Sequence, residues 1–173
     1  WIGHSLGFRK SILGLDQGFT ERKLVGKGDH RIADLAVRRL KRAAREGRRF
    51  FGWVFFGSPH GPYQAHYRRA PARTAMQRYR QELRYMDEQA GRVLAALAKS
   101  GLAERTIVIY TGDHGEEFRE HGGRRHKSTV YAESTHVPLL VRVPGLAGGP
   151  VHAVTSTLYL FPWLLLRGTD EMR

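Results

Sequence analysis

The sequence contains no cysteine and no long apolar run. Without cysteine there is no disulfide framework, no thiolate metal site and no cysteine nucleophile in this chain. Its longest apolar stretches, residues 50–56 and 158–166, are much shorter than the roughly 20 residues of a membrane-spanning helix. We therefore expect no transmembrane segment here, and any export signal would lie upstream.

Acidic residues are also scarce, because 29 lysines and arginines stand against 16 aspartates and glutamates, for a formal net charge of +13. Such an excess attracts polyanions such as nucleic acids or sulfated glycans. Many of the arginines crowd residues 38–49, which we interpret as the solvated face of a helix. No RRM, KH, zinc-finger or helix-turn-helix signature is present, so we expect no specific nucleic-acid partner.

The 173 residues suit one domain, and since the chain begins at Trp1 we interpret it as part of a longer one. Residues 1–28 are glycine-rich and predict a loop. Apolar residues at helical spacing predict helices over 29–47 and 74–99. Apolar runs predict strands over 50–56, 106–110 and 137–143, the second buried on both faces and the third at an end of the sheet. A short helix over 155–166 would be interrupted by Pro162.

The strand at 50–56, the helix at 74–99 and the strand at 106–110 predict a βαβ unit with parallel strands. His60 follows the first strand and Asp113-His114 the second, so both should lie at one sheet edge, where ligands bind in open parallel sheets. The charged loop 116–127 should cover the same edge. The fold class is then α/β, a mainly parallel sheet with helices on both faces, here incomplete.

Asp113 and His114 form an adjacent carboxylate and imidazole on a glycine-flanked turn. Such a pair could ligate one divalent cation, although an Asx turn with a surface histidine is the simpler interpretation of two residues alone. Together with His60, His126 and Lys127 they would suit an anionic phosphate or sulfate ester. Two ligands are too few for a hard cation, which takes about six oxygens, so other ligands must come from elsewhere.

Three segments carry a family resemblance: T-G-D-H-G-E-E-F-R-E-H-G at 111–122, R-H-K-S-T-V-Y-A-E-S-T-H-V-P-L-L-V-R-V-P-G at 125–145, and S-P-H-G-P-Y at 58–63. In order and spacing they closely resemble the second half of the catalytic domain of sulfatases, in the alkaline phosphatase superfamily. The resemblance covers roughly residues 15–166. It implies an alkaline-phosphatase-like sandwich, and residues 1–173 would be a partial catalytic domain.

The resemblance also implies residue roles. Asp113 and His114 would be metal ligands, and Lys127 would contact the sulfate and the leaving oxygen. His60 would bind substrate and act as general acid. His126 matches a histidine of some phosphoryl-transfer relatives, although an exposed loop histidine is an equal alternative.

The family nucleophile segment, C/S-x-P-x-R with formylglycine made from its cysteine or serine, is absent from these residues. We expect it upstream, together with an acidic pair that completes the metal site, so this chain alone should be inactive or nearly so. The resemblance favours Ca²⁺, although the histidine ligand would also suit Mn²⁺ or Zn²⁺. It also favours a periplasmic, extracellular or lysosomal setting, and the sequence does not determine the oligomeric state.

Three functions stay open. The first is metal-dependent hydrolysis of sulfate esters by the full-length protein. The second is hydrolysis of phosphate or phosphonate esters, or phosphoglycerol or phosphoethanolamine transfer, on the same scaffold with an unmodified threonine or serine nucleophile. The third is a non-catalytic pseudoenzyme that binds polyanions through its basic surface.

Overall fold

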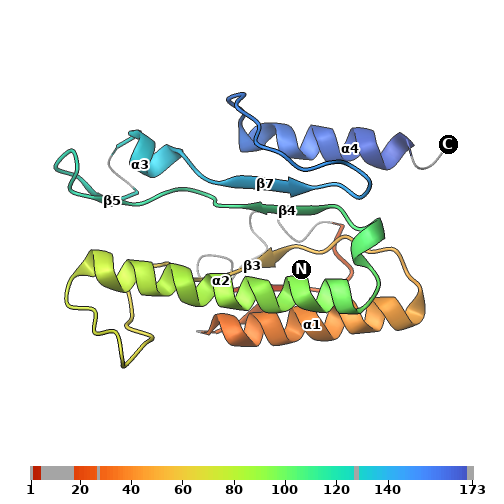
Figure 1. Ribbon diagram of the computed structural model, residues 1–173, viewed down its shortest axis with the longest axis horizontal. Coiled ribbons are helices and arrows are strands. Elements are labelled where there is room, and N and C mark those ends of the chain that lie inside the picture. The colour runs from red at the N-terminus through yellow and green to blue at the C-terminus, as the bar shows by residue number, and fades with distance from the viewer. Residues whose placement is uncertain (1, 5–17, 27, 127–128, 171–173) are drawn as a thin grey trace.

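The computed structural model describes residues 2–4, 18–26, 28–126 and 129–170 (Figure 1). Lys127, one of the predicted site residues, lies outside them. The elements are, in order, β1 (Ile2–His4), β2 (Lys23–Val25), α1 (Asp29–Glu46), β3 (Val54–Phe55), α2 (Ala75–Lys99), the 3₁₀ helix η2 (Ala103–Arg105), β4 (Val108–Thr111), β5 (Glu117–Phe118), β6 (Arg124–Arg125), α3 (Ala132–Thr135), β7 (Leu139–Arg142), the 3₁₀ helix η3 (Thr157–Tyr159) and α4 (Leu160–Asp170).

The helix α1 forms as its apolar spacing predicts. Ile32 and Ala36 are buried on one stripe, and Gly47 ends the helix in the left-handed conformation with φ 62°, which glycine adopts without strain. The stripe packs against α2 and against Val54 of β3. Asp29 is the first helical residue, and Gly28 occupies the cap position.

The helix α2 begins with a capping box. Thr74 accepts a hydrogen bond from the Gln77 amide, and the Gln77 side chain accepts one from the Thr74 amide. This pairing satisfies two amides that the first turn would leave without partners. Gly101, with φ 70°, follows the last turn. Both predicted helices are thus confirmed close to their predicted bounds.

The strands pair differently from the prediction. The segments β2, β1 and β3 form a parallel three-stranded sheet in that order, so the expected loop over residues 1–28 was wrong at both described strands. β4 pairs with β7, antiparallel, and β5 with β6, also antiparallel. The chain is therefore α/β, and the part described contains one parallel sheet and two antiparallel pairs rather than the predicted mainly parallel sheet.

The predicted βαβ unit keeps its direction but not its pairing. β3 and β4 point toward the same end of the molecule in Figure 1, where β5 and α3 also lie, while α1 and α2 lie on one side of the strands and α4 on the other. β3 pairs with β1, however, and is only two residues long. β4 is half-buried rather than buried on both faces, and β7 leaves Leu140 59% exposed.

Pro162 does not interrupt the last helix. α4 runs from Leu160 through Pro162 to Asp170, because a proline in the first turn of a helix replaces an amide that has no partner within the helix. No helix in the described ranges is long and apolar enough to span a bilayer.

Candidate functional site

The turn after β4 presents Asp113 and His114 to solvent. Their side chains are 63% and 39% exposed, and His114 Nε2 lies 3.7 Å from Asp113 Oδ2. The other imidazole nitrogen, Nδ1, is 2.8 Å from the carbonyl oxygen of Gly115. A carbonyl can only accept a hydrogen bond, so Nδ1 carries the proton and the Nε2 lone pair faces the carboxylate. This arrangement orients an imidazole as a metal ligand.

Gly115 joins this turn to α3. Its amide donates a 2.8 Å hydrogen bond to the Ser134 carbonyl. A Cβ atom at this position would lie 2.1 Å from the Glu133 carbonyl oxygen, which is impossible without moving the backbone. The two segments can therefore approach this closely only because residue 115 has no side chain.

His126 lies against the Asp113-His114 turn. Its ring stacks on His114, with the ring centroids 3.7 Å apart and the planes tilted by 24°. His126 Nδ1 is 3.1 Å from Glu116 Oε1, with the His126 side chain 20% and the Glu116 side chain 5% exposed. Because a carboxylate only accepts, Nδ1 donates, and Nε2 forms no hydrogen bond among the described residues. His126 is therefore not the exposed loop histidine of the alternative interpretation.

Glu116 also connects the loop that follows β3. The Tyr63 hydroxyl donates to Glu116 Oε2. Burial raises the pKa of Tyr63, and the hydrogen bond to Glu116 raises it further. The Tyr63 ring also packs against Phe118, with the two ring centroids 5.7 Å apart. One carboxylate and two aromatic rings therefore hold the two loops together.

A second carboxylate, Glu117, organises the loop between β5 and β6. It is 2% exposed, although the segment around it is rich in charged residues. It accepts hydrogen bonds from the amides of His121 and Gly123 at 3.3 and 3.1 Å and from the Thr129 hydroxyl at 2.7 Å. The Thr129 hydrogen bond is the main cause that lowers the pKa of Glu117. These bonds fix the chain on both sides of residues 127–128.

The structure brings His60 to the same region without a direct bond to Asp113, His114 or His126. His60 is exposed and follows β3. Next to it, the Cβ position of Gly61 lies 3.9 Å from the guanidinium carbon of Arg125, the residue before His126. Of the five predicted site residues, the structure thus joins Asp113, His114 and His126, leaves His60 on the neighbouring loop and does not describe Lys127.

The donor set fits one arm of a divalent-cation site. Asp113 supplies carboxylate oxygens and His114 supplies Nε2, and both atoms are close enough to bind one ion. Within the described ranges no group of three or more acidic or histidine side chains could hold a metal ion. A hard cation takes about six oxygens, which is more than Asp113 and His114 can supply.

Sequence reasoning missed the residues that support the site. Glu116, Glu117 and Tyr63 were assigned no role in it, although each contacts or orders a predicted site segment. One signal was available for the two glutamates, since both directly follow the Asp-His-Gly turn. For Tyr63 the only signal was its place in the S-P-H-G-P-Y segment.

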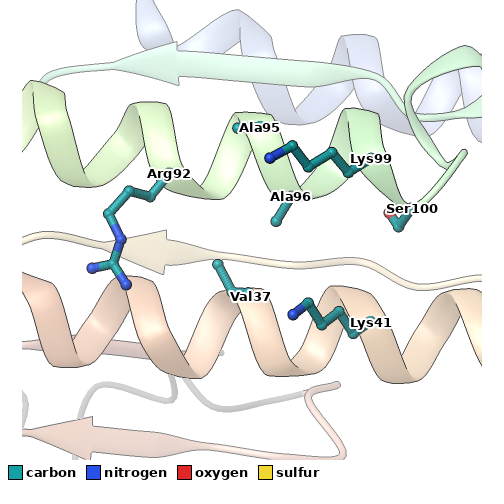
Figure 2. Close-up of a pocket in the computed structure, with 7 residues that line it drawn as sticks. All are labelled: Val37, Lys41, Arg92, Ala95, Ala96, Lys99 and Ser100. Atoms are coloured by element: carbon teal, nitrogen blue, oxygen red, sulfur yellow. The ribbon is translucent and has the colours of Figure 1, made fainter.

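A basic groove lies elsewhere, between α1 and α2. Figure 2 shows Lys41 of α1 and Lys99 of α2 over a floor that includes Val37 and Ala96. Arg92 extends from α2 toward α1 and is neutralised by Asp34, to which it donates a hydrogen bond. Lys41 and Lys99 therefore give this groove a positive charge.

Comparison with known proteins identifies the family. The Sulfatase family model matches residues 10–166. Arylsulfatase K of Bos taurus is 42% identical over 80 residues, which are 46% of this chain and 15% of that protein. Human iduronate 2-sulfatase is 37% identical over 106 residues, 61% of this chain and 18% of that protein.

A solved structure gives the same result for the fold. The crystal structure of yidJ from Bacteroides fragilis, described as a sulfatase, superposes with a TM-score of 0.61 at 22% identity, over 69% of this chain and 31% of that one. The chain thus spans less than a third of each of these relatives. With the family model matching most of its length, the chain belongs to the sulfatase family.

Proposed function

We propose that the full-length protein hydrolyses sulfate esters in a metal-dependent reaction, and that this chain supplies one arm of the metal site and part of the substrate site. The observation that carries the proposal is the joining of His126 to the Asp113-His114 turn by ring stacking, in a chain that matches the Sulfatase model. Three chemically suitable side chains lie together at the end of the strand β4, on an exposed surface that a substrate can reach.

In this proposal Asp113 and His114 hold a divalent cation, which when bound would neutralise charge on a sulfate oxygen. Asp113 provides its carboxylate oxygens, and the Gly115 carbonyl keeps the His114 Nε2 lone pair available. Because the family resemblance favours it, we propose Ca²⁺. Manganese and zinc are the alternatives that an imidazole ligand would favour.

The other residues act on the ester itself. The Nε2 atom of His126, whose ring is oriented by Glu116, can donate a hydrogen bond to an anionic oxygen when the ring is protonated. Lys127, the next residue, brings a positive charge to the sulfate and the leaving oxygen. His60 binds the ester from the neighbouring loop and protonates the leaving group, a role that its exposure permits.

The nucleophile comes from outside this chain. We propose a formylglycine in an upstream C/S-x-P-x-R segment, because no such segment occurs in these 173 residues. We also propose that upstream strands complete one mainly parallel sheet with helices on both faces. This would cover apolar side chains such as Leu140 of β7 and Phe161 of α4, which are 59% and 68% exposed. An exported or lysosomal location completes the proposal.

Kinetics on the full-length protein test this function. We expect 4-nitrophenyl sulfate to be hydrolysed with a kcat/KM at least 100-fold above that for 4-nitrophenyl phosphate. Asp113→Ala and Lys127→Ala should each lower kcat/KM by at least 100-fold, while Lys41→Ala, in the groove between the helices, should not change it.

Two outcomes would favour the alternatives. Preference for the phosphate ester, together with an unmodified serine or threonine nucleophile, would replace sulfatase activity with phosphoryl transfer. Absence of turnover on both esters, with heparin binding that Lys41→Ala weakens and Asp113→Ala leaves unchanged, would replace enzymatic activity with polyanion binding.

A further inference from the structure

The loop that carries His60 is held at its start by a buried carboxylate. Asp29, the first residue of α1, is 1% exposed. Its Oδ1 accepts a 2.8 Å hydrogen bond from the Gly57 amide, and its Oδ2 accepts one of 3.2 Å from the Ser58 amide. Both amides directly precede Pro59 and His60. The positive end of the α1 dipole favours a negative charge at this first-turn position, which strengthens both bonds.

The same loop is held at its other end by α2. The buried Glu82 accepts a 2.9 Å hydrogen bond from the Gln64 amide. Gln81 accepts hydrogen bonds from the amides of His66 and Tyr67, at 2.9 and 3.3 Å. Five backbone amides on the two sides of residues 59–63 therefore bond to side chains of the two long helices.

These hydrogen bonds fix the conformation of the loop in the absence of secondary structure. The loop from residue 56 to residue 73 contains no helix or strand, so its conformation depends on side-chain acceptors. A buried carboxylate that accepts two amides at once fixes the direction in which the chain leaves β3. A side-chain amide in the same place could accept only one of these two hydrogen bonds, and its own N–H group would face the other backbone amide.

We propose that Asp29 is a positioning residue for His60, with Gln81 and Glu82 securing the far end of the same loop. This inference rests on the proposed function, since it assigns His60 a role in binding the sulfate ester. Asp29 does not touch the substrate. It fixes the backbone that places the imidazole.

The first test is a double-mutant cycle in the full-length protein with 4-nitrophenyl sulfate. Asp29→Asn keeps the side-chain volume and removes one of the two hydrogen bonds. We expect it to lower kcat/KM about tenfold in the wild-type background and less than twofold in the His60→Ala background, because its effect passes through His60. Asp34→Asn is the matched control, since Asp34 lies on the same helix but forms an exposed ion pair with Arg92, and it should change kcat/KM less than twofold in both backgrounds.

The second test does not depend on activity. Hydrogen exchange should show the amides of Gly57, Ser58 and His60 exchanging at least tenfold faster in Asp29→Asn than in the wild type, with no change in Asp34→Asn. If His60→Ala abolishes turnover, the same cycle is measured on the Kd of inorganic sulfate. If Asp29→Asn does not fold, Gln81→Ala replaces it, with the accelerated exchange expected at residues 66–67.

The outcomes separate the two proposals. A wild-type protein that hydrolyses no sulfate ester and binds no sulfate would overturn the proposed function and the role of Asp29 in catalysis, whatever the exchange rates. In an active protein, an equal loss of kcat/KM in the wild-type and His60→Ala backgrounds would overturn the positioning role alone. So would unchanged exchange at Gly57 and Ser58 in Asp29→Asn.

Discussion

Replacing Gly115 with alanine should separate the Asp113-His114 turn from α3. The new Cβ would lie 2.1 Å from the Glu133 carbonyl oxygen, whereas ordinary contact begins at 3.4 Å. The two backbones must therefore move apart by about 1.3 Å, the difference between these distances. A movement of that size would stretch the 2.8 Å bond from Gly115 to Ser134 beyond hydrogen-bonding length.

The expected cost follows from these two effects. Overpacking a close contact costs about 1–3 kcal/mol, and the lost backbone hydrogen bond adds about 1 kcal/mol. We therefore expect Gly115→Ala to lower the free energy of unfolding by about 2–4 kcal/mol. Because the displaced turn carries Asp113 and His114, the Kd for a divalent cation should rise at least tenfold.

Urea denaturation of the full-length protein followed by circular dichroism measures the first effect, and calorimetric titration with Ca²⁺ measures the second. Gly91→Ala is the matched control, because Gly91 lies in α2 and its Cβ position has no atom within 4 Å. This control should raise stability by about 0.5–1 kcal/mol without changing the Kd. If Gly115→Ala is as stable as the wild type and binds the cation equally well, the close contact between the turn and α3 does not exist in solution.

Three further predictions concern the two carboxylates and the metal. Glu116→Gln can accept only one of its two hydrogen bonds, so steady-state kinetics should show kcat/KM for a sulfate ester about tenfold lower, and an unchanged value would exclude a role in orienting His126. Chelation with EDTA should lower the Tm of the wild-type protein but not that of Asp113→Ala, as scanning calorimetry can measure. The pKa of Glu117 is lowered below its usual 4.5, so its ionised form stabilises the fold above that pH, and the benefit is lost as the pH falls through the folded value. Urea midpoints of the wild type and Glu117→Gln should therefore differ above pH 4.5 and converge only when the pH has fallen below the folded pKa of Glu117.

The helices could be predicted because their signals are local. Ile32 and Ala36 lie one turn apart on the buried stripe of α1, and Thr74 and Gln77 are three residues apart in the capping box. Strand pairing depends on partners far away in the sequence. The apolar pattern of residues 106–110 therefore located a strand but not its antiparallel pairing with β7. The glycine-rich start of the chain gave no sign of β1 and β2.

The candidate site divides in the same way. Asp113, His114 and His126 could be identified from residue type and motif, and the structure brings them together. The burial of Glu117 could not be predicted from residue type or motif. Glu117 accepts its hydrogen bonds from backbone amides that come together only after the loop has folded. A charged residue in a polar segment predicts exposure unless the geometry of its donors is known.

The contacts that support the Asp113-His114 turn mostly join residues that are close in the sequence, and this affects the order in which the site can form. The turn is held by Gly115 against Ser134, and the loop by Glu117 against Gly123 and Thr129. All these partners lie within residues 111–136, so this segment can order itself once β4 and β7 have paired. The link to the His60 loop is longer in sequence and passes through Tyr63 to Glu116. Loss of the Tyr63 hydroxyl should therefore loosen the substrate side of the site while leaving the arrangement of Asp113 and His114 intact.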